Sequence, residues 1–472
     1  MSKINASILL LLLIASAVYP ASDAQQTARE KNKAIVDTTY RENLLKHKDH
    51  ADILVLPGIL ADRTIKRITI QAEATGRGEH DTIEFFLIAE ESAHDYESLA
   101  VALAKPSDVH KALVFIGMTP GRPVNYEKMC FWPKGERVII SLRSNDYKLL
   151  AEPVRIEKFI LNRDTNKTMS ENGLVFTGSL MVESCVQKGV LVYAADGSGP
   201  DSLASNYNEP QTVLDIPRNA PQSDVYGSQA VNPDYVLPAG NLLEIIIEPE
   251  YKDGKKRVTD LCLDINPGAK ANPNEQKPEE LALTVKNTDG QVLNDEKTLN
   301  SALKLFTSFV EKGHDPFVTI RFGENLALKS LQEISTLLAS IESENGIRIE
   351  PPPNGQLYYK SFLPNEEFRD RKKRASQPWE LHFSAQKGDI IASLVKIEQI
   401  WKKNEVYPDL KVTEFEIKSP KALQEKLKQE GPGMPVILVY SFSQIKYGEI
   451  MNFLRPMLTT YPTIHVFIED GI

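Results

Sequence analysis

The stretch PFVTIRF at residues 316–322 is an apolar run opened by a proline, and PVILVY at residues 435–440 repeats this pattern 119 positions later. Both runs have the length and residue types of a buried strand. Each is followed by apolar residues at offsets i, i+3 and i+7, which share one face of a helix. These are Leu331, Ile334 and Leu338 in the first copy, and Ile450, Phe453 and Met457 in the second. The repeat therefore predicts two modules, each with a helix packed on a strand.

The two copies differ inside this helix. Pro456 stands where the first copy has Leu337, and a proline inside a helix removes an amide donor. We expect a kink or an early end there. Each copy then closes on a short alternating run, at residues 347–349 and 464–468, which predicts a further strand.

Three short motifs in this region carry a family resemblance. They are an Asp-Gly turn at residues 289–290, an Asn-Asp pair at residues 294–295, and a Tyr-Gly helix start at Tyr447 and Gly448. With these motifs the C-terminal part of the chain resembles the soluble periplasmic module of ExbD and TolR proteins. Modules of that family dimerise and meet envelope partners, which makes Tyr447 and Gly448 the candidate binding residues.

The resemblance implies two small α/β modules with mixed sheets, ExbD/TolR-like, at residues 278–350 and 389–472. The stretch between them, residues 351–388, begins with three prolines and contains a basic run at residues 369–374. Such composition is typical of a solvated linker. We therefore expect residues 351–388 to join the modules without a fold of their own.

Residues 51–270 are expected to form a separate β-rich domain. Alternating apolar runs, such as those at residues 65–70 and 137–142, predict half-buried strands. The strings HDYESL at residues 94–99 and NEPQTVLDIP at residues 208–217 resemble the YdjY-type domain of exported bacterial proteins. The predicted fold class is therefore α+β, with a YdjY-like β-rich N-terminal domain followed by the two small modules.

The N-terminus has the features of an export signal. An apolar run at residues 6–18 is followed by small residues, which predicts a signal peptide at residues 1–24, cleaved near Ala24. The polar residues 25–50 are expected to be a flexible lead-in. No later apolar run reaches the roughly 20 residues that a membrane helix needs. The mature chain is therefore expected in the periplasm or outside the cell, without a transmembrane span.

Composition excludes some functions. The net charge of -9 argues against a nucleic-acid partner, because such a partner requires a basic face. The three cysteines, Cys130, Cys185 and Cys262, lie too far apart for a local zinc or redox motif. The sequence has no GxSxG elbow and no glycine-rich phosphate loop. No catalytic residue and no cofactor is assigned, and we do not expect an enzyme.

One set of residues keeps an enzymatic alternative open. His94, Glu97 and His110 have the imidazole and carboxylate groups that suit zinc-like ions. A metal-dependent hydrolase would use them together. Their spacing matches no compact zinc motif, however, so the sequence assigns no metal site and favours a structural role.

The functional prediction follows from what the family resemblance does not carry over. Motor proteins of the ExbD/TolR family begin with a membrane helix that bears an acidic residue, and residues 6–18 contain none. The sequence therefore predicts an exported, non-enzymatic binding or scaffolding protein of the bacterial cell envelope. Its partner would be an envelope protein or the cell wall, with a possible homodimer through the modules. The alternative is an accessory of an ExbB/ExbD-type transport system.

Overall fold

The computed structural model describes residues 23–469, apart from residues 198, 273, 275, 346, 354, 387–388, 404–405 and 432. The predicted signal peptide lies outside these residues except at its last two positions. The chain forms two units, each described by itself. The first contains the described residues up to Val124 together with Pro133–Asp253, and the second contains Asn125–Trp132 and the residues from Gly254 onward. Within the described part, no helix is long and apolar enough to cross a membrane.

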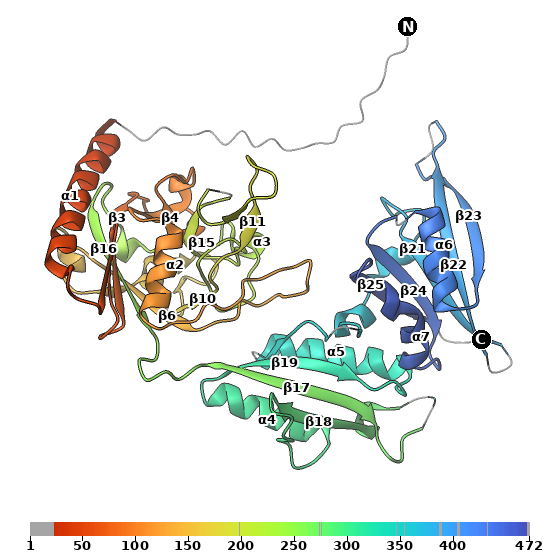
Figure 1. Ribbon diagram of the computed structural model, residues 1–472. Coiled ribbons are helices and arrows are strands. Elements are labelled where there is room, and N and C mark those ends of the chain that lie inside the picture. Colours follow the sequence, from red (N-terminus) through yellow and green to blue (C-terminus); the bar gives the residue numbers. More distant parts are fainter. Residues whose placement is uncertain are drawn as a thin grey trace, which may run out of the picture. The chain divides into compact units, whose positions relative to one another are not determined.

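A closed β-sheet forms the centre of the first unit (Figure 1). Eight strands follow one another in the order β3, β16, β6, β10, β14, β13, β4 and β5, and β5 pairs back onto β3. Their bounds are β3 Arg67–Ala74, β4 Phe85–Ala89, β5 Ser98–Ala102, β6 Arg137–Arg143, β10 Leu174–Phe176, β13 Ser202–Ser205, β14 Leu214–Asp215 and β16 Leu242–Pro249. Inward residues such as Ile68, Ile70 and Ile245 are fully buried. The sheet therefore closes around one apolar core, and the predicted α+β class is confirmed.

Shorter elements complete the first unit. β1 (Ile53–Leu56) and β2 (Ile59–Asp62) extend the sheet from β3, and helix α2 (Pro106–Phe115) buries Val109 and Leu113 in the core. The remaining elements are β7 Val154–Arg155, β8 Ile160–Asn162, β9 Lys167–Thr168, β11 Met181–Glu183, β12 Leu191–Tyr193, β15 Gln229–Val231, α3 Gln222–Val225, and the 3₁₀ helices η1 Asp95–Glu97, η2 Lys148–Leu150, η3 Ile156–Phe159 and η4 Pro233–Tyr235.

The expectation of a flexible lead-in at residues 25–50 is wrong. Residues Asp23–His47 form helix α1. Asn32 donates to Glu73 Oε2 at 2.8 Å and to the Gly240 carbonyl at 3.0 Å, while Arg29 pairs with the same carboxylate at 3.2 Å. Glu73 is fully buried, so these contacts satisfy its charge. The polar composition of this segment indicated exposure to solvent. Two of its polar residues, Arg29 and Asn32, instead bind the buried carboxylate of Glu73.

The second unit contains two modules with the same strand pairing. In the first module, β17 pairs antiparallel with β18 and parallel with β19, and β19 pairs parallel with β20. In the second, β21 pairs antiparallel with β22 and parallel with β24, and β24 pairs parallel with β25. A further strand, β23, pairs antiparallel with β22 and has no counterpart among the described strands of the first sheet. Each module thus has a mixed sheet, as predicted.

The bounds of these elements follow the sequence pattern closely in the repeated parts. In the first module they are β17 Val258–Pro267, η5 Pro278–Glu280, β18 Leu281–Asn287, α4 Leu299–Glu311, β19 Asp315–Phe322, α5 Leu328–Asn345 and β20 Arg348–Ile349. In the second they are β21 Trp379–Gln386, β22 Asp389–Ile400, β23 Asp409–Ile417, α6 Pro420–Glu430, β24 Val436–Phe442, α7 Tyr447–Leu454, η8 Arg455–Met457 and β25 Thr463–Glu469. Helix α7 gives way to a 3₁₀ turn containing Pro456, which confirms the early end.

Two expected boundaries are wrong. Strand β17 belongs to the first module's sheet, so the module begins before residue 270. The predicted linker at residues 351–388 contains the 3₁₀ helices η6 (Tyr359–Phe362) and η7 (Glu366–Arg369) and most of β21. Its aromatic residues Tyr358, Tyr359 and Phe362 are buried in the core that both modules share. The proline-rich composition indicated a solvated linker, but this segment packs into the shared core of the two modules.

Candidate functional site

The sheet of the second module has two differently covered faces. Ile437, Val439 and Val466 join the core that contains helices α6 and α7, as strand alternation requires. The intervening residues point to the other face, where Leu438, Tyr440 and Phe467 form a small cluster of their own. We call this second side the outer face. It is covered by the segment 366–376, and the candidate site lies here.

A buried carboxylate anchors that segment to the outer face. The side chain of Glu380 on β21 is fully inaccessible, and it accepts hydrogen bonds from Arg374 at 2.7 Å, Arg371 at 2.5 Å and His382 at 2.9 Å. Burial alone would raise the pKa of Glu380, but hydrogen bonds from His382 and the two arginines lower it to about 2. Arg374 also donates to Tyr440 Oη at 2.9 Å and to the Phe368 carbonyl. Its guanidinium is therefore committed to structure.

Stacked rings continue from this anchor across the outer face. His382 stacks on Tyr440 with 4.7 Å between ring centroids, and Tyr440 stacks on Phe467 at 5.0 Å. The guanidinium of Arg369 lies 5.2 Å from the Phe467 ring, within the range of a cation–π contact. These contacts hold the segment and the strands in one arrangement.

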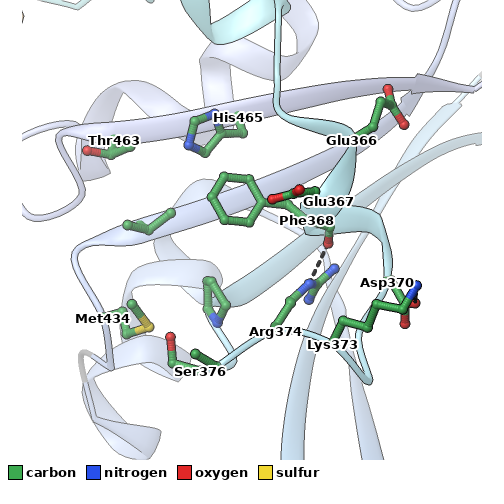
Figure 2. Close-up of a pocket in the computed structure, with 13 residues that line it drawn as sticks. Glu366, Glu367, Phe368, Asp370, Lys373, Arg374, Ser376, Met434, Thr463 and His465 are labelled. Carbon is green, nitrogen blue, oxygen red and sulfur yellow. Dashed lines mark hydrogen bonds and ion pairs between the residues drawn. The ribbon is translucent and has the colours of Figure 1, made fainter. Parts of the chain in front are cut away.

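Beside the stack, the outer face opens into a hollow of about 910 Å³ (Figure 2). Val436, Thr463 and His465 come from the starts of β24 and β25, and Phe368 comes from the covering segment. The rings of Phe368 and His465 lie 5.0 Å apart. Other lining residues are Glu366, Glu367, Asp370, Lys373, Arg374, Ala375, Ser376, Pro378 and Met434. We call this site the β24–β25 hollow.

His465 gives the hollow its unsatisfied polar atom. Its Nδ1 is buried and has no hydrogen-bond partner among the described residues, and burial lowers the pKa of the imidazole. The ring is therefore neutral at pH 7. Because this nitrogen is unpaired, neither Ser376 nor Thr463 is joined to it as a nucleophile to a base. The hollow suits an apolar group with a hydrogen-bonding atom.

The predicted metal candidates are only partly brought together. His94 Nδ1 lies 2.5 Å from Glu97 Oε1, and this hydrogen bond raises the pKa of His94. His110 instead contacts Tyr193 Oη at 3.0 Å and the Gly178 carbonyl at 3.2 Å, and burial lowers its pKa. No three His, Cys, Asp or Glu side chains in the described ranges gather so that they could hold a metal. The geometry gives the metal-hydrolase alternative no support.

Glu84 adds a buried acid next to this pair. It is 2% exposed, and its Oε2 accepts from Gln222 at 2.8 Å, while Oε1 has no partner among the described residues. Burial, with the nearby charge of Glu97, raises the pKa of Glu84. His94 also packs edge-on against Phe85, at 5.5 Å between ring centroids. The site therefore consists of the packed His94, the Glu97 carboxylate that is hydrogen-bonded to it, and the Glu84 carboxyl, of which only Oε2 has a partner among the described residues.

The candidate binding residues Tyr447 and Gly448 both make contacts inside the second unit. Tyr447 is fully buried, and its hydroxyl accepts from the Leu357 amide at 2.9 Å. A Cβ on Gly448 would lie 2.9 Å from the Glu324 Cβ and 3.1 Å from its carbonyl oxygen. The Tyr-Gly helix start therefore sits at the junction of the two modules.

This junction relates the modules by the repeat itself. Ala327 forms an antiparallel bridge with Lys446, which is its own equivalent 119 positions later. The flanking backbone hydrogen bonds occur in pairs. In each pair, the second bond joins the two residues that correspond, through the 119-residue repeat, to those of the first bond. They run from Gly448 N to Glu324 O (2.8 Å) and Lys329 N to Ser443 O (3.3 Å), and from Tyr447 N to Leu326 O (2.8 Å) and Leu328 N to Ile445 O (3.1 Å). The contact is isologous, as in a twofold dimer, but lies within one chain.

Comparison with known proteins identifies the first domain. Residues 59–212 match the family model described as the YdjY domain. No curated protein matches the chain. Among solved structures, the chain is similar to "Crystal structure of Prototype Foamy Virus Protease-Reverse Transcriptase (native)", with 12% identity, a TM-score of 0.11, and coverage of 45% of this chain and 36% of that one. This likeness is too low to define a fold. These matches name no ExbD or TolR protein.

Proposed function

We propose that the chain is an exported, non-enzymatic binding protein of the bacterial cell envelope, in which the paired modules form a platform and the β24–β25 hollow takes the ligand. The observation that carries this proposal is the chemistry of the hollow. Its Arg374 is held by the buried Glu380, stacked rings lie beside it, and the buried Nδ1 of His465 has no hydrogen-bond partner among the described residues. Such a site recognises a group by shape and one hydrogen bond.

The ExbD/TolR resemblance is part of the same proposal. In the first module, strand β18 is followed by a turn at Gly290 and a bridge between Lys286 and Val292. Asn294 then holds this segment, because its side chain accepts from the Val285 amide at 2.9 Å and donates to the Leu283 carbonyl at 2.8 Å. This order of strand, glycine turn, short paired segment and asparagine before a helix supports the likeness.

The test uses the full chain expressed in bacteria with its own N-terminus. Mass spectrometry of the mature protein should find a new N-terminus near residue 24 if the chain is exported. The immobilised protein should then retain an envelope component, and Thr463→Trp, which places a bulky ring in the lining of the hollow, should abolish retention. If the retained component is an ion-conducting motor subunit, the result would favour the alternative in which the chain is an accessory of an ExbB/ExbD-type transport system.

A separate measurement addresses catalysis. Elemental analysis should find less than one bound metal ion per chain, and a panel of ester and amide substrates should not be hydrolysed. A stoichiometric metal, or turnover that is lost in His94→Ala and Glu97→Gln, would overturn the proposal. His110→Ala serves as the matched control, because His110 occupies a different site in the same domain.

A further inference from the structure

The repeat allows the hollow to be compared with the same corner of the first module. Val436 pairs with Thr463, and its equivalent Phe317 pairs with Arg348. Phe317 lies 119 positions before Val436, and its neighbour Val318 belongs to the shared core, so Phe317 points to the outer face of its own sheet. The two pairs therefore occupy corresponding positions.

In the first module this corner is filled. The guanidinium of Arg348 lies 5.4 Å from the Phe317 ring and 5.2 Å from the Trp132 ring, and it pairs with Asp315 at 2.9 Å. The indole Nε1 of Trp132 donates to Glu342 Oε1 at 3.3 Å. An indole brought in by the segment Asn125–Trp132, with its N–H satisfied, thus covers the outer face of the first module.

In the second module the corresponding corner is open and is lined by different groups. Thr463 replaces the long Arg348, the Phe368 ring supplies an apolar wall, and Nδ1 of the neutral His465 is a free acceptor in the tautomer that carries its proton on Nε2. A planar ring with one N–H donor would satisfy both. This is the chemistry of an indole.

The chain exposes such a group near the hollow. Trp401, directly after β22, is 62% exposed. Gln399 donates to the Arg374 carbonyl at 2.9 Å, which holds this end of β22 beside the segment that walls the hollow. Lys402 and Lys403 follow Trp401, and Lys402 pairs with Asp409. Among the carboxylates that line the hollow, Glu366 pairs with Arg369 and Asp370 pairs with Lys373, whereas Glu367 has no ion pair within the described part of the chain. Aromatic and basic groups on one surface thus face a complementary hollow on another.

We propose, resting on the binding role of the hollow, that it takes the Trp401 indole of a second copy of this chain. Because Trp401 and the hollow are neighbours on each copy, two reciprocal insertions form around one twofold axis and the dimer closes. Lys403 beside each Trp401 meets Glu367 in the lining of the partner's hollow. The edge that pairs Ala327 with Lys446 is already used within the chain, so this dimer requires a separate surface.

The test is sedimentation of the full chain over a range of concentrations. Wild type should dimerise, and Trp401→Ala should weaken dimerisation by more than about tenfold, as loss of a tryptophan anchor does in other interfaces. Thr463→Trp should do the same by filling the hollow. A mixture of the two variants should form heterodimers, because one hollow and one Trp401 remain intact. Tyr226→Ala, which removes another exposed aromatic residue, should dimerise normally.

Trp401 is exposed, so its alanine variant should keep the fold, and a melting temperature equal to that of wild type at a concentration where both are monomeric will show this. Wild type that is monomeric throughout, or Trp401→Ala that dimerises like wild type, would overturn the proposal. Titration with N-acetyl-tryptophanamide distinguishes failure of the dimer proposal from failure of the proposed binding role of the hollow. Binding to a monomeric wild type but not to Thr463→Trp would leave the hollow as a ligand site and reject the second copy, whereas no binding and no dimer would reject both.

Discussion

The two modules of the second unit share their strand pairing but differ in what covers the outer face. At the position of Glu380 the first module has Cys262, and at the position of His382 it has Asp264, as the pairing with Thr319 and Arg321 shows. Asp264 is partly exposed and pairs with Lys286 at 2.5 Å. Glu380, in contrast, is sealed under residues 366–376. The same alternating strand therefore gives a solvated ion pair or a buried charge, depending on the segment laid over it.

The most damaging change should be Glu380→Gln. It removes the charge that satisfies Arg374, whose side chain is only 3% exposed, and breaking a buried ion pair from one side is costly. We expect the free energy of unfolding to fall by about 3 kcal/mol. Denaturant unfolding of Asp264→Asn is the matched control from the first module, where less than about 1 kcal/mol should be lost. Equal losses would mean that the two outer faces do not differ.

Glu380 also predicts a difference in acid. Folding lowers the pKa of this carboxyl from 4.5 to about 2, so its stabilisation is present above pH 4.5 and is lost as the pH falls toward 2. Wild type should therefore lose stability more steeply than Glu380→Gln across this interval. Parallel curves would contradict this assignment.

Opening the first module should make it resemble the second. Trp132→Ala removes the indole beside Arg348, and we expect a loss of about 2 kcal/mol, less than for a fully buried tryptophan because Trp132 is half-buried. N-acetyl-tryptophanamide should then raise the melting temperature of this variant by refilling the corner. The exposed Trp401 provides the control, since its alanine variant should melt like wild type at a concentration where both are monomeric. Failure of the added indole to restore any stability would weaken the comparison of the two corners.

At the junction between the modules, a substitution on the side of the second module should destabilise the protein, whereas one at the equivalent position of the first module should not. Gly448→Val introduces a side chain where Cβ alone would press on Glu324, and overpacking of this kind costs about 1.5 kcal/mol. The equivalent position in the first module is Lys329, which already has a side chain, so Lys329→Ala should change stability by less than about 0.5 kcal/mol. Thermal unfolding of both variants measures the asymmetry, and a mild Gly448→Val would indicate that the junction yields.

The smallest effect is expected at the hollow itself. His465→Phe removes a buried nitrogen that has no partner among the described residues, so the free energy of unfolding at pH 7 should rise by about 0.5 kcal/mol. Because folding lowers the pKa of His465, wild type should lose stability as the pH falls below 6.5, where the unfolded chain gains the proton. The variant should lack this loss. A destabilised His465→Phe would show that the imidazole makes a needed contact.

Much of the second unit followed from the sequence, because the repeat compares the chain with itself. Helical offsets identified Leu331, Ile334 and Ile450 as core residues, and all three are fully buried. Pro456 marked the end of α7 because a proline has no amide to donate. These features depend on local geometry, which sequence patterns report well.

What the sequence missed depends on segments that meet from distant positions. The basic run at residues 369–374 indicated a solvated linker, yet Arg371 and Arg374 fold onto Glu380. Strand alternation places Glu380 and His465 on the same face of the sheet, but it does not show which segment covers that face. His94 and Glu97 are near in sequence and do pair, whereas the position of His110 depends on the packing of α2 against β10 residue Phe176. Pattern alone cannot supply such partners.

The bridge between Ala327 and Lys446 has a consequence for how this chain can change over time. In a dimer of identical subunits one gene encodes both sides of the twofold contact, so any substitution alters both at once. Joining the halves in one polypeptide keeps them together at any dilution and gives each half its own codons. The corner of the first module is thus filled by the Trp132 indole, while the corresponding corner of the second module is open. Identical subunits encoded by one gene cannot acquire such a difference.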